Sequence, residues 1–185
     1  MSFKSYKNVA WLPVDSVLDI VLQKDISLPV VESKFPVTAV FAFAFSKDKK
    51  HIYLMKNRNK ERGLDIPGGH VEKHESSMDA LNREVLEEIG CILSKTRYVG
   101  AQIIRKKRIE DNDKYPFLES AQLFFMAEVD TIVTDKLEED SLERIKIPVI
   151  DFFKSLNNRS DIYYIELFNQ AFLSLTEAQR DCTIE

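Results

Sequence analysis

The chain is poor in cysteine and has no excess of positive charge. Its two cysteines, Cys91 and Cys182, lie far apart and form no metal-binding or redox motif, so we expect free thiols in a reducing compartment. The net charge is −4, because 30 acidic residues outnumber 26 basic ones. Proteins that bind the nucleic-acid backbone regardless of sequence carry an excess of basic residues. We therefore expect no general nucleic-acid binding.

Long apolar runs and linker segments are also missing. The longest apolar run, 39–45, is far too short to cross a bilayer, and residues 1–14 contain no apolar core of signal-peptide length. We therefore expect a cytoplasmic protein without a membrane partner. No internal repeat and no segment rich in Pro, Gly or Ser divides the 185 residues, which favours one domain over 1–185. Within it we expect a core at 36–185 that ends in a helix, preceded by an extension at 1–35.

The spacing of apolar residues predicts both strands and helices. Residues 37–45 are apolar on both faces, as in a strand that is covered on both sides. The other predicted strands are 51–56, 97–108 and 121–129, and the other predicted helices are 15–24, 148–156 and 161–175. A sheet that is buried between helices gives an α/β sandwich.

Residues 76–90 combine the signals of a helix start, an apolar stripe and a helix end. Ser76 is a good N-cap, and Gly90 is a natural C-terminal stop. The apolar stripe consists of Met78, Leu81, Val85 and Ile89. A turn at 67–69, Pro-Gly-Gly, comes shortly before the helix.

Glu84, Glu87 and Glu88 lie on one side of this predicted helix, beside its apolar stripe. Their spacing makes them neighbours in space, and like charges this close favour a cation that neutralises them. Hard divalent ions such as Mg²⁺ take carboxylate oxygens and often carry phosphate substrates with them. A solvated acidic helix face is the alternative interpretation of the same three residues.

The segment resembles the signature of the Nudix hydrolase family. That signature is Gly, five residues, Glu, seven residues and then Arg-Glu-U-x-Glu-Glu-x-Gly-U, where U is a bulky aliphatic residue. The matching positions are Gly69, Glu75, Arg83, Glu84, Val85, Glu87, Glu88 and Gly90. Only Cys91 departs from it, and cysteine often behaves as a small buried hydrophobe.

The resemblance implies a Nudix-type α/β/α sandwich with a mixed β-sheet between helices. It also implies Mg²⁺-dependent (or Mn²⁺-dependent) hydrolysis of a diphosphate linkage in a nucleoside diphosphate derivative. By match to the motif, Glu87 and Glu88 are the expected direct metal ligands, and Glu84 is either a ligand or the general base. The main-chain carbonyl of Gly69 is a further expected ligand.

The resemblance also assigns supporting residues. The resemblance places Arg83 among the catalytic residues, together with the glutamates. We expect Arg83 to hold the loop and the helix together through an ion pair with Glu75. Gly68 and Gly90 are expected to support the shape of the site.

Residues outside the motif are further candidates, and for each of them solvated surface charge is the alternative interpretation. Relatives often supply another carboxylate from a later loop. The first candidates here are Glu139 and Glu143, beside Glu138 and Asp140, with Glu119 and Glu128 as other options. Arg58 is a candidate phosphate contact, because a guanidinium fork suits phosphate oxygens, and the basic run 105–108 is a second.

The substrate is the least determined part of the interpretation. The marks of hydrolases that act on ADP-ribose, NADH or dinucleoside polyphosphates are not found at their expected places after the motif. By elimination, we expect a small-molecule nucleotide partner. The first candidate is a nucleoside triphosphate, including an oxidised guanine nucleotide, cleaved to monophosphate and pyrophosphate. The alternatives are hydrolysis of ADP-ribose or nucleotide sugars, a non-catalytic nucleotide-sensing module, and an isomerase or RNA-decapping relative. The resemblance leaves a homodimer open.

Overall fold

The computed structural model describes residues 4–7, 9, 12–13, 15–57, 63–109, 111, 115–133, 137, 142–156 and 163–180. The chain divides into two compact units. The first unit comprises residues 1–39, 98–124 and 161–185, and the second comprises 40–97 and 125–160. The strands β3 (Val37–Phe45), β7 (Cys91–Arg105) and β8 (Glu119–Ile132) contribute residues to both units.

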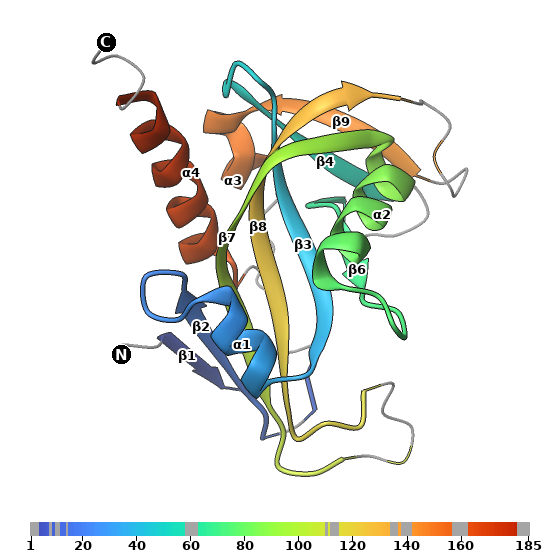
Figure 1. The fold of residues 1–185 in the computed structure, drawn as a ribbon, viewed down its shortest axis with the longest axis vertical. Helices are drawn as coiled ribbons and strands as arrows, with labels where there is room; N and C mark the ends of the chain where they lie inside the picture. The colour runs from blue at the N-terminus through green and yellow to red at the C-terminus, as the bar shows by residue number, and fades with distance from the viewer. Residues whose placement is uncertain are drawn as a thin grey trace. The chain divides into compact units, whose positions relative to one another are not determined.

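The first unit is built on antiparallel strands with two helices. Its own elements are β1 (Lys4–Lys7), β2 (Val17–Leu22), α1 (Leu28–Lys34) and α4 (Ile165–Arg180). β1 pairs with β2, and β2 pairs with β7, as Figure 1 shows at the blue strands. Leu18, Val31 and Leu167 are fully buried, so β2 and both helices contribute to this core. The predicted helix 161–175 is confirmed in kind, although α4 begins later, at Ile165.

The predicted helix at 15–24 is wrong, because this segment forms strand β2. In the register with β7, Val17 lies opposite Arg105 and Leu22 lies opposite Gly100. Residues 18–21 are all buried, including Asp19. A short run that is buried at nearly every position has no period that separates a strand from a helix. The hydrogen bonds to β1 and β7 therefore decide the outcome, and these partners are not visible locally in the sequence.

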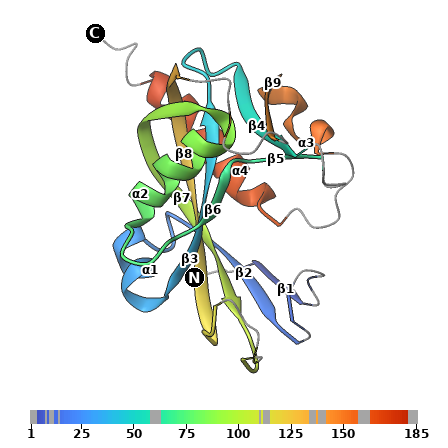
Figure 2. The ribbon, with the colours of Figure 1, turned by 90° about the vertical axis from the view of Figure 1, so that its right-hand side faces the viewer.

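The second unit carries the candidate motif. Its own strands are β4 (His51–Asn57), β5 (Leu64–Asp65), β6 (Gly68–His70) and β9 (Leu142–Pro148), and its helices are α2 (Ser77–Ile89), η1 (Val149–Asp151) and α3 (Phe152–Ser155). β4 pairs with β3, β5 and β9, as the upper right of Figure 2 shows for β4, β5 and β9. β6 pairs with β3. The predicted helix at 148–156 exists as the two short helices η1 and α3.

The strand directions make the sheet mixed. β2 and β7 are antiparallel. β3 and β8 are neighbours in the sheet, and the amide of Ala121 at the start of β8 donates to the carbonyl of Pro36, just before β3. Two neighbouring strands whose beginnings lie together run in the same direction. The predicted α/β class with a mixed sheet is thus confirmed. Within the described residues, no helix has both the length and the apolar character that crossing a membrane requires.

Candidate active site

Helix α2, which carries the motif, begins and ends as its sequence predicts. The hydroxyl of Ser76 accepts a hydrogen bond from the amide of Asp79 at 3.1 Å, which is the N-cap contact. At the other end, Gly90 has φ +63°, the left-handed conformation that glycine adopts without strain, and its amide donates to Leu86. These two signals fix the length of α2, and therefore which turn carries each glutamate.

One member of the predicted apolar stripe is misplaced. Leu81, Val85 and Ile89 are fully buried, but Met78 is 36% exposed. Ser77 lies on the buried face instead, because it comes four residues before Leu81 and so points to the same side of the helix. Met78, the next residue, points about 100° away from Ser77 around the helix axis. The three buried residues of the stripe form the packed face of α2, and the glutamates lie beside this face, as predicted.

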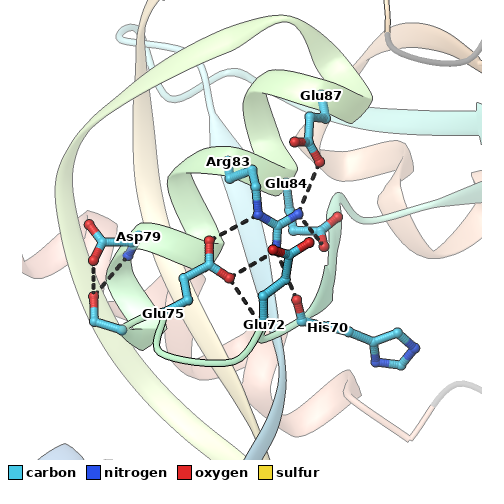
Figure 3. A network of polar contacts seen from close by, with 8 residues as sticks. His70, Glu72, Glu75, Asp79, Arg83, Glu84 and Glu87 are labelled. Carbon is cyan, nitrogen blue, oxygen red and sulfur yellow. Dashed lines mark hydrogen bonds and ion pairs between the residues drawn. The ribbon is translucent and has the colours of Figure 1, made fainter. Parts of the chain in front are cut away.

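Arg83 is the centre of the polar network on α2 (Figure 3). Its guanidinium forms two hydrogen bonds with Glu75, from Nε to Oε1 at 2.9 Å and from Nη2 to Oε2 at 3.0 Å. Nη1 lies 3.0 Å from both Glu84 Oε1 and Glu87 Oε2, and Nη2 donates to the carbonyl of His70 at 2.9 Å. The predicted ion pair between Glu75 and Arg83 is confirmed. The network ties the loop before α2 to the helix, while the imidazole ring of His70 points away from it.

The charges in this network are strongly coupled. The hydrogen bonds from Arg83 lower the pKa of Glu75 below its usual range, and the same contact raises the pKa of Arg83. The Arg83 side chain is 25% exposed, and that of Glu84 is 14% exposed, so water screens these charges only in part. Three carboxylates share this one guanidinium, which leaves an excess of negative charge at the surface of α2.

Gly68 and Gly69 bring the main chain against the carboxylates of α2. The amide of Gly68 donates to Glu88 Oε2 at 2.7 Å. A Cβ on Gly69 would lie 2.4 Å from Glu84 Oε1, so any larger residue would displace that carboxylate from its present position. The contact between Gly68 and Glu88 was not predicted, because the only sequence signal for it was a glycine-rich turn before an acidic helix.

The donor chemistry of this cluster suits a hard divalent cation. Glu84, Glu87 and Glu88 offer carboxylate oxygens, and the main chain at Gly68 and Gly69 lies against the carboxylates of Glu88 and Glu84. Among the described residues, however, no three His, Cys, Asp or Glu side chains are grouped as a metal ion would need. Glu84 and Glu87 instead meet at Arg83 Nη1. A cation at this cluster would therefore share the carboxylate oxygens of Glu84 and Glu87 with the guanidinium of Arg83.

Glu143 lies on β9, a strand that contacts α2, but the side chain that contacts the helix is that of its neighbour Arg144. Arg144 Nη1 donates to the carbonyl of Ile89 at 2.7 Å. Side chains alternate along a strand, so Glu143 lies on the other face of β9, where the register places Lys56 opposite. The other first candidates, Glu139 and Arg58, lie outside the described residues, as do Glu138, Asp140 and Cys182.

The two remaining acidic candidates form ion pairs of their own. Glu119 pairs with Arg105 in the first unit at 2.8 Å. Glu128, which is buried in the second unit, pairs with Lys95 at 3.0 Å. Arg105 also binds Asp19, so the first residue of the basic run 105–108 neutralises acidic side chains of the protein itself.

Comparison with known proteins places this chain in a family. Residues 35–167 match the model of the NUDIX domain, which is more than half of the chain, and the protein therefore belongs to the Nudix family. It is similar to 8-oxo-dGTP diphosphatase of Buchnera aphidicola subsp. Acyrthosiphon pisum, with 42% identity over 50 residues, which are 27% of this chain and 40% of that protein. It is also similar to putative 8-oxo-dGTP diphosphatase YtkD of Bacillus subtilis, with 30% identity over 74 residues, 35% of this chain and 47% of that protein. The chain thus spans less than half the length of these curated relatives.

Solved structures show the same fold at low sequence identity. The pyrophosphohydrolase BsRppH of Bacillus subtilis, solved as a point mutant, has a TM-score of 0.59 at 16% identity and covers 98% of this chain and 99% of its own. A NUDIX hydrolase from Nitrosomonas europaea has a TM-score of 0.56 at 17% identity, over 75% of this chain and 90% of its own. A structure from a study of MutT of Aliivibrio salmonicida and Vibrio cholerae has a TM-score of 0.51 at 20% identity, over 75% and 98%. The predicted family and fold are confirmed.

Proposed function

We propose that the protein is a hydrolase that uses a divalent cation to cleave a nucleoside triphosphate to monophosphate and pyrophosphate. An oxidised guanine nucleotide such as 8-oxo-dGTP is the first candidate substrate. The observation that carries the proposal is the excess of carboxylate oxygens on α2, held by Arg83 against the turn at Gly68 and Gly69. The names of the two curated relatives support the choice of substrate.

In this proposal the motif residues divide into cation ligands, a general base and a positioning residue. Glu87 and Glu88 hold the cation, Mg²⁺ or Mn²⁺, with the carbonyl of Gly69 as a further ligand. When bound, such a cation neutralises phosphate oxygens and makes bound water more acidic. Glu84 either completes the ligand set or takes the proton from the attacking water. Arg83 is a positioning residue, since its guanidinium contacts Glu84 and Glu87 directly.

The proposal includes a cytoplasmic location. The chain has only two cysteines, far apart in sequence, and Cys91 is buried, which fits a reducing compartment.

The test is a substrate panel assayed with the full chain. We would incubate the protein with 8-oxo-dGTP, dGTP, ADP-ribose and a nucleotide sugar, with Mg²⁺, with Mn²⁺ and with a chelator. We expect cation-dependent release of pyrophosphate from the triphosphates. Glu88→Gln should lower kcat about 100-fold or more while the protein stays folded, because a cation ligand is lost. Glu119→Gln is the matched control, since Glu119 pairs with Arg105 and should leave turnover unchanged.

Three results would count against parts of the proposal. Cleavage of ADP-ribose or nucleotide sugars alone would exclude the triphosphate substrate. Tight nucleotide binding without cation-dependent turnover would identify a sensing module instead. Normal turnover by Glu88→Gln would remove the assignment of the cation site.

A further inference from the structure

The C-terminal end of α2 has no positive charge of its own. The last turn of the helix contains no basic residue, although it carries Glu87 and Glu88. The C-terminal end of a helix is the negative end of its dipole, so two carboxylates there are in an unfavourable place. The last carbonyl groups of the helix also need donors from outside it.

Donors from β7, from β9 and from the residue after β8 meet this helix end. The carbonyl of Ile89 accepts from Cys91 Sγ on β7 at 3.3 Å and from Arg144 Nη1 on β9 at 2.7 Å. The carbonyl of Gly90 accepts from the amide of Val133, just after β8, at 3.0 Å. Arg144 is the charged donor among these three, and its bond to the carbonyl is therefore the strongest of them.

We propose that Arg144 is a positioning residue that anchors the end of α2 and so sets the orientation of Glu87 and Glu88 for cation binding. Arg144 holds the carbonyl of Ile89, and Glu88 directly precedes Ile89, so a movement of the main chain at Ile89 is passed on to the glutamate. The carboxylate of Glu88 also accepts a hydrogen bond from the amide of Gly68. The carboxylate therefore has little freedom to move once the end of the helix is fixed. Arg144 lies outside the Nudix motif, and this inference rests on the proposed function.

Positioning and simple electrostatics predict opposite effects of removing Arg144. A positive charge near the carboxylates repels a cation, so its removal alone would strengthen cation binding. Loss of an anchor would weaken binding instead, and indirect partners of metal ligands typically contribute about tenfold or more in metal affinity. The sign of the change therefore distinguishes the two roles.

The experiment compares three variants by Mn²⁺ titration without nucleotide, followed by electron paramagnetic resonance. Arg144→Met removes the anchor, and Arg144→Lys keeps the charge and a donor. Lys146→Met is the matched control: it removes one charge from the same face of β9, two residues on, where Lys146 lies over the ring of Tyr53 at 5.6 Å. Amide hydrogen exchange of Gly90 reports the end of α2 independently of any cation.

We expect Arg144→Met to bind Mn²⁺ about tenfold more weakly and to exchange the Gly90 amide about tenfold faster. Arg144→Lys should recover most of both losses, and Lys146→Met should match the unmodified protein. In turnover, kcat of Arg144→Met should fall while KM for the nucleotide stays within about twofold, because the defect lies in the cation ligands. Should Arg144→Met not fold, Arg144→Gln carries the same comparison, because it also removes the positive charge and the guanidinium.

Equal or tighter Mn²⁺ binding by Arg144→Met would overturn the inference, and so would faster exchange with unchanged Mn²⁺ affinity, which would make Arg144 merely structural. Failure of the proposed function looks different. In that case the unmodified protein itself shows no cation-dependent turnover, while Mn²⁺ binding and Gly90 exchange still decide the role of Arg144.

Discussion

Arg83→Lys tests whether the geometry of the guanidinium, beyond its charge, holds the site together. Arg83 makes five hydrogen bonds to four residues, two of them a parallel pair to Glu75. Lysine keeps the positive charge but has a single nitrogen with three donors. At least two of the five hydrogen bonds must therefore be lost, and the parallel pair to Glu75 cannot be rebuilt.

The expected loss of stability follows from the number of contacts and their exposure. A hydrogen bond to a charged group contributes about 1.5–3 kcal/mol when it is buried. The side chains of Arg83 and Glu87 are 25% and 28% exposed, so partial screening reduces each contact to about 1 kcal/mol. Two lost contacts give about 2 kcal/mol, which lowers Tm by about 4–8 °C in a chain of this size.

The assay is thermal unfolding by calorimetry in the presence of a chelator, so that no cation takes the place of the guanidinium. Arg97→Lys is the matched control, because Arg97 is exposed on β7 and the same exchange there should leave Tm unchanged. A variant Arg83→Lys that melts within about 1 °C of the unmodified protein would refute the reasoning, since two charged contacts of this exposure should shift Tm several degrees.

The remaining predictions separate stability from activity. Gly68→Ala should lower Tm strongly, because its Cβ would lie 2.2 Å from a carbonyl oxygen of β3 and its φ is +149°. Gly69→Ala should mainly weaken Mn²⁺ binding, since its Cβ at 2.4 Å displaces only the flexible end of Glu84; equal Tm losses for both would contradict this. Arg83 lowers the pKa of Glu75, so ionised Glu75 stabilises the fold above the usual carboxyl pKa of about 4.3, and this stabilisation is lost as the pH falls. Glu75→Gln should therefore lower Tm most at pH 7, and the difference in Tm should shrink as the pH falls below about 4.3. A difference in Tm that does not change with pH would exclude the ionised carboxylate as its source.

Local signals were sufficient where a residue acts on its own neighbours in the chain. Ser76 and Gly90 mark the ends of α2 because their effects, a hydroxyl acceptor and a left-handed backbone, need only the adjacent turn. The ion pair of Glu75 with Arg83 was predictable for a similar reason, since a short loop and two turns of helix separate them. The spacing of the glutamates also indicated which side of the helix carries them.

Predictions failed where a segment depends on distant partners. The strand at Val17–Leu22 was predicted as a helix, because its burial comes from β1 and β7 rather than from its own period. Glu143 stays a candidate ligand by position, and the sequence did not show that the alternation of β9 places its neighbour Arg144 against α2. No local pattern gives the face that a strand presents to a helix more than fifty residues earlier in the chain.

The sequence by itself determined the family, the extent of α2 and the set of carboxylates, because these depend on residue type and on spacing within a few turns. The tertiary structure decided what surrounds the carboxylates: Arg83 between Glu84 and Glu87, the amide of Gly68 on Glu88, and Arg144 at the end of the helix. The physical reason is range. A cap or a helical stripe is fixed by neighbours in the chain, whereas the partner of a buried charge is fixed only when distant strands have paired.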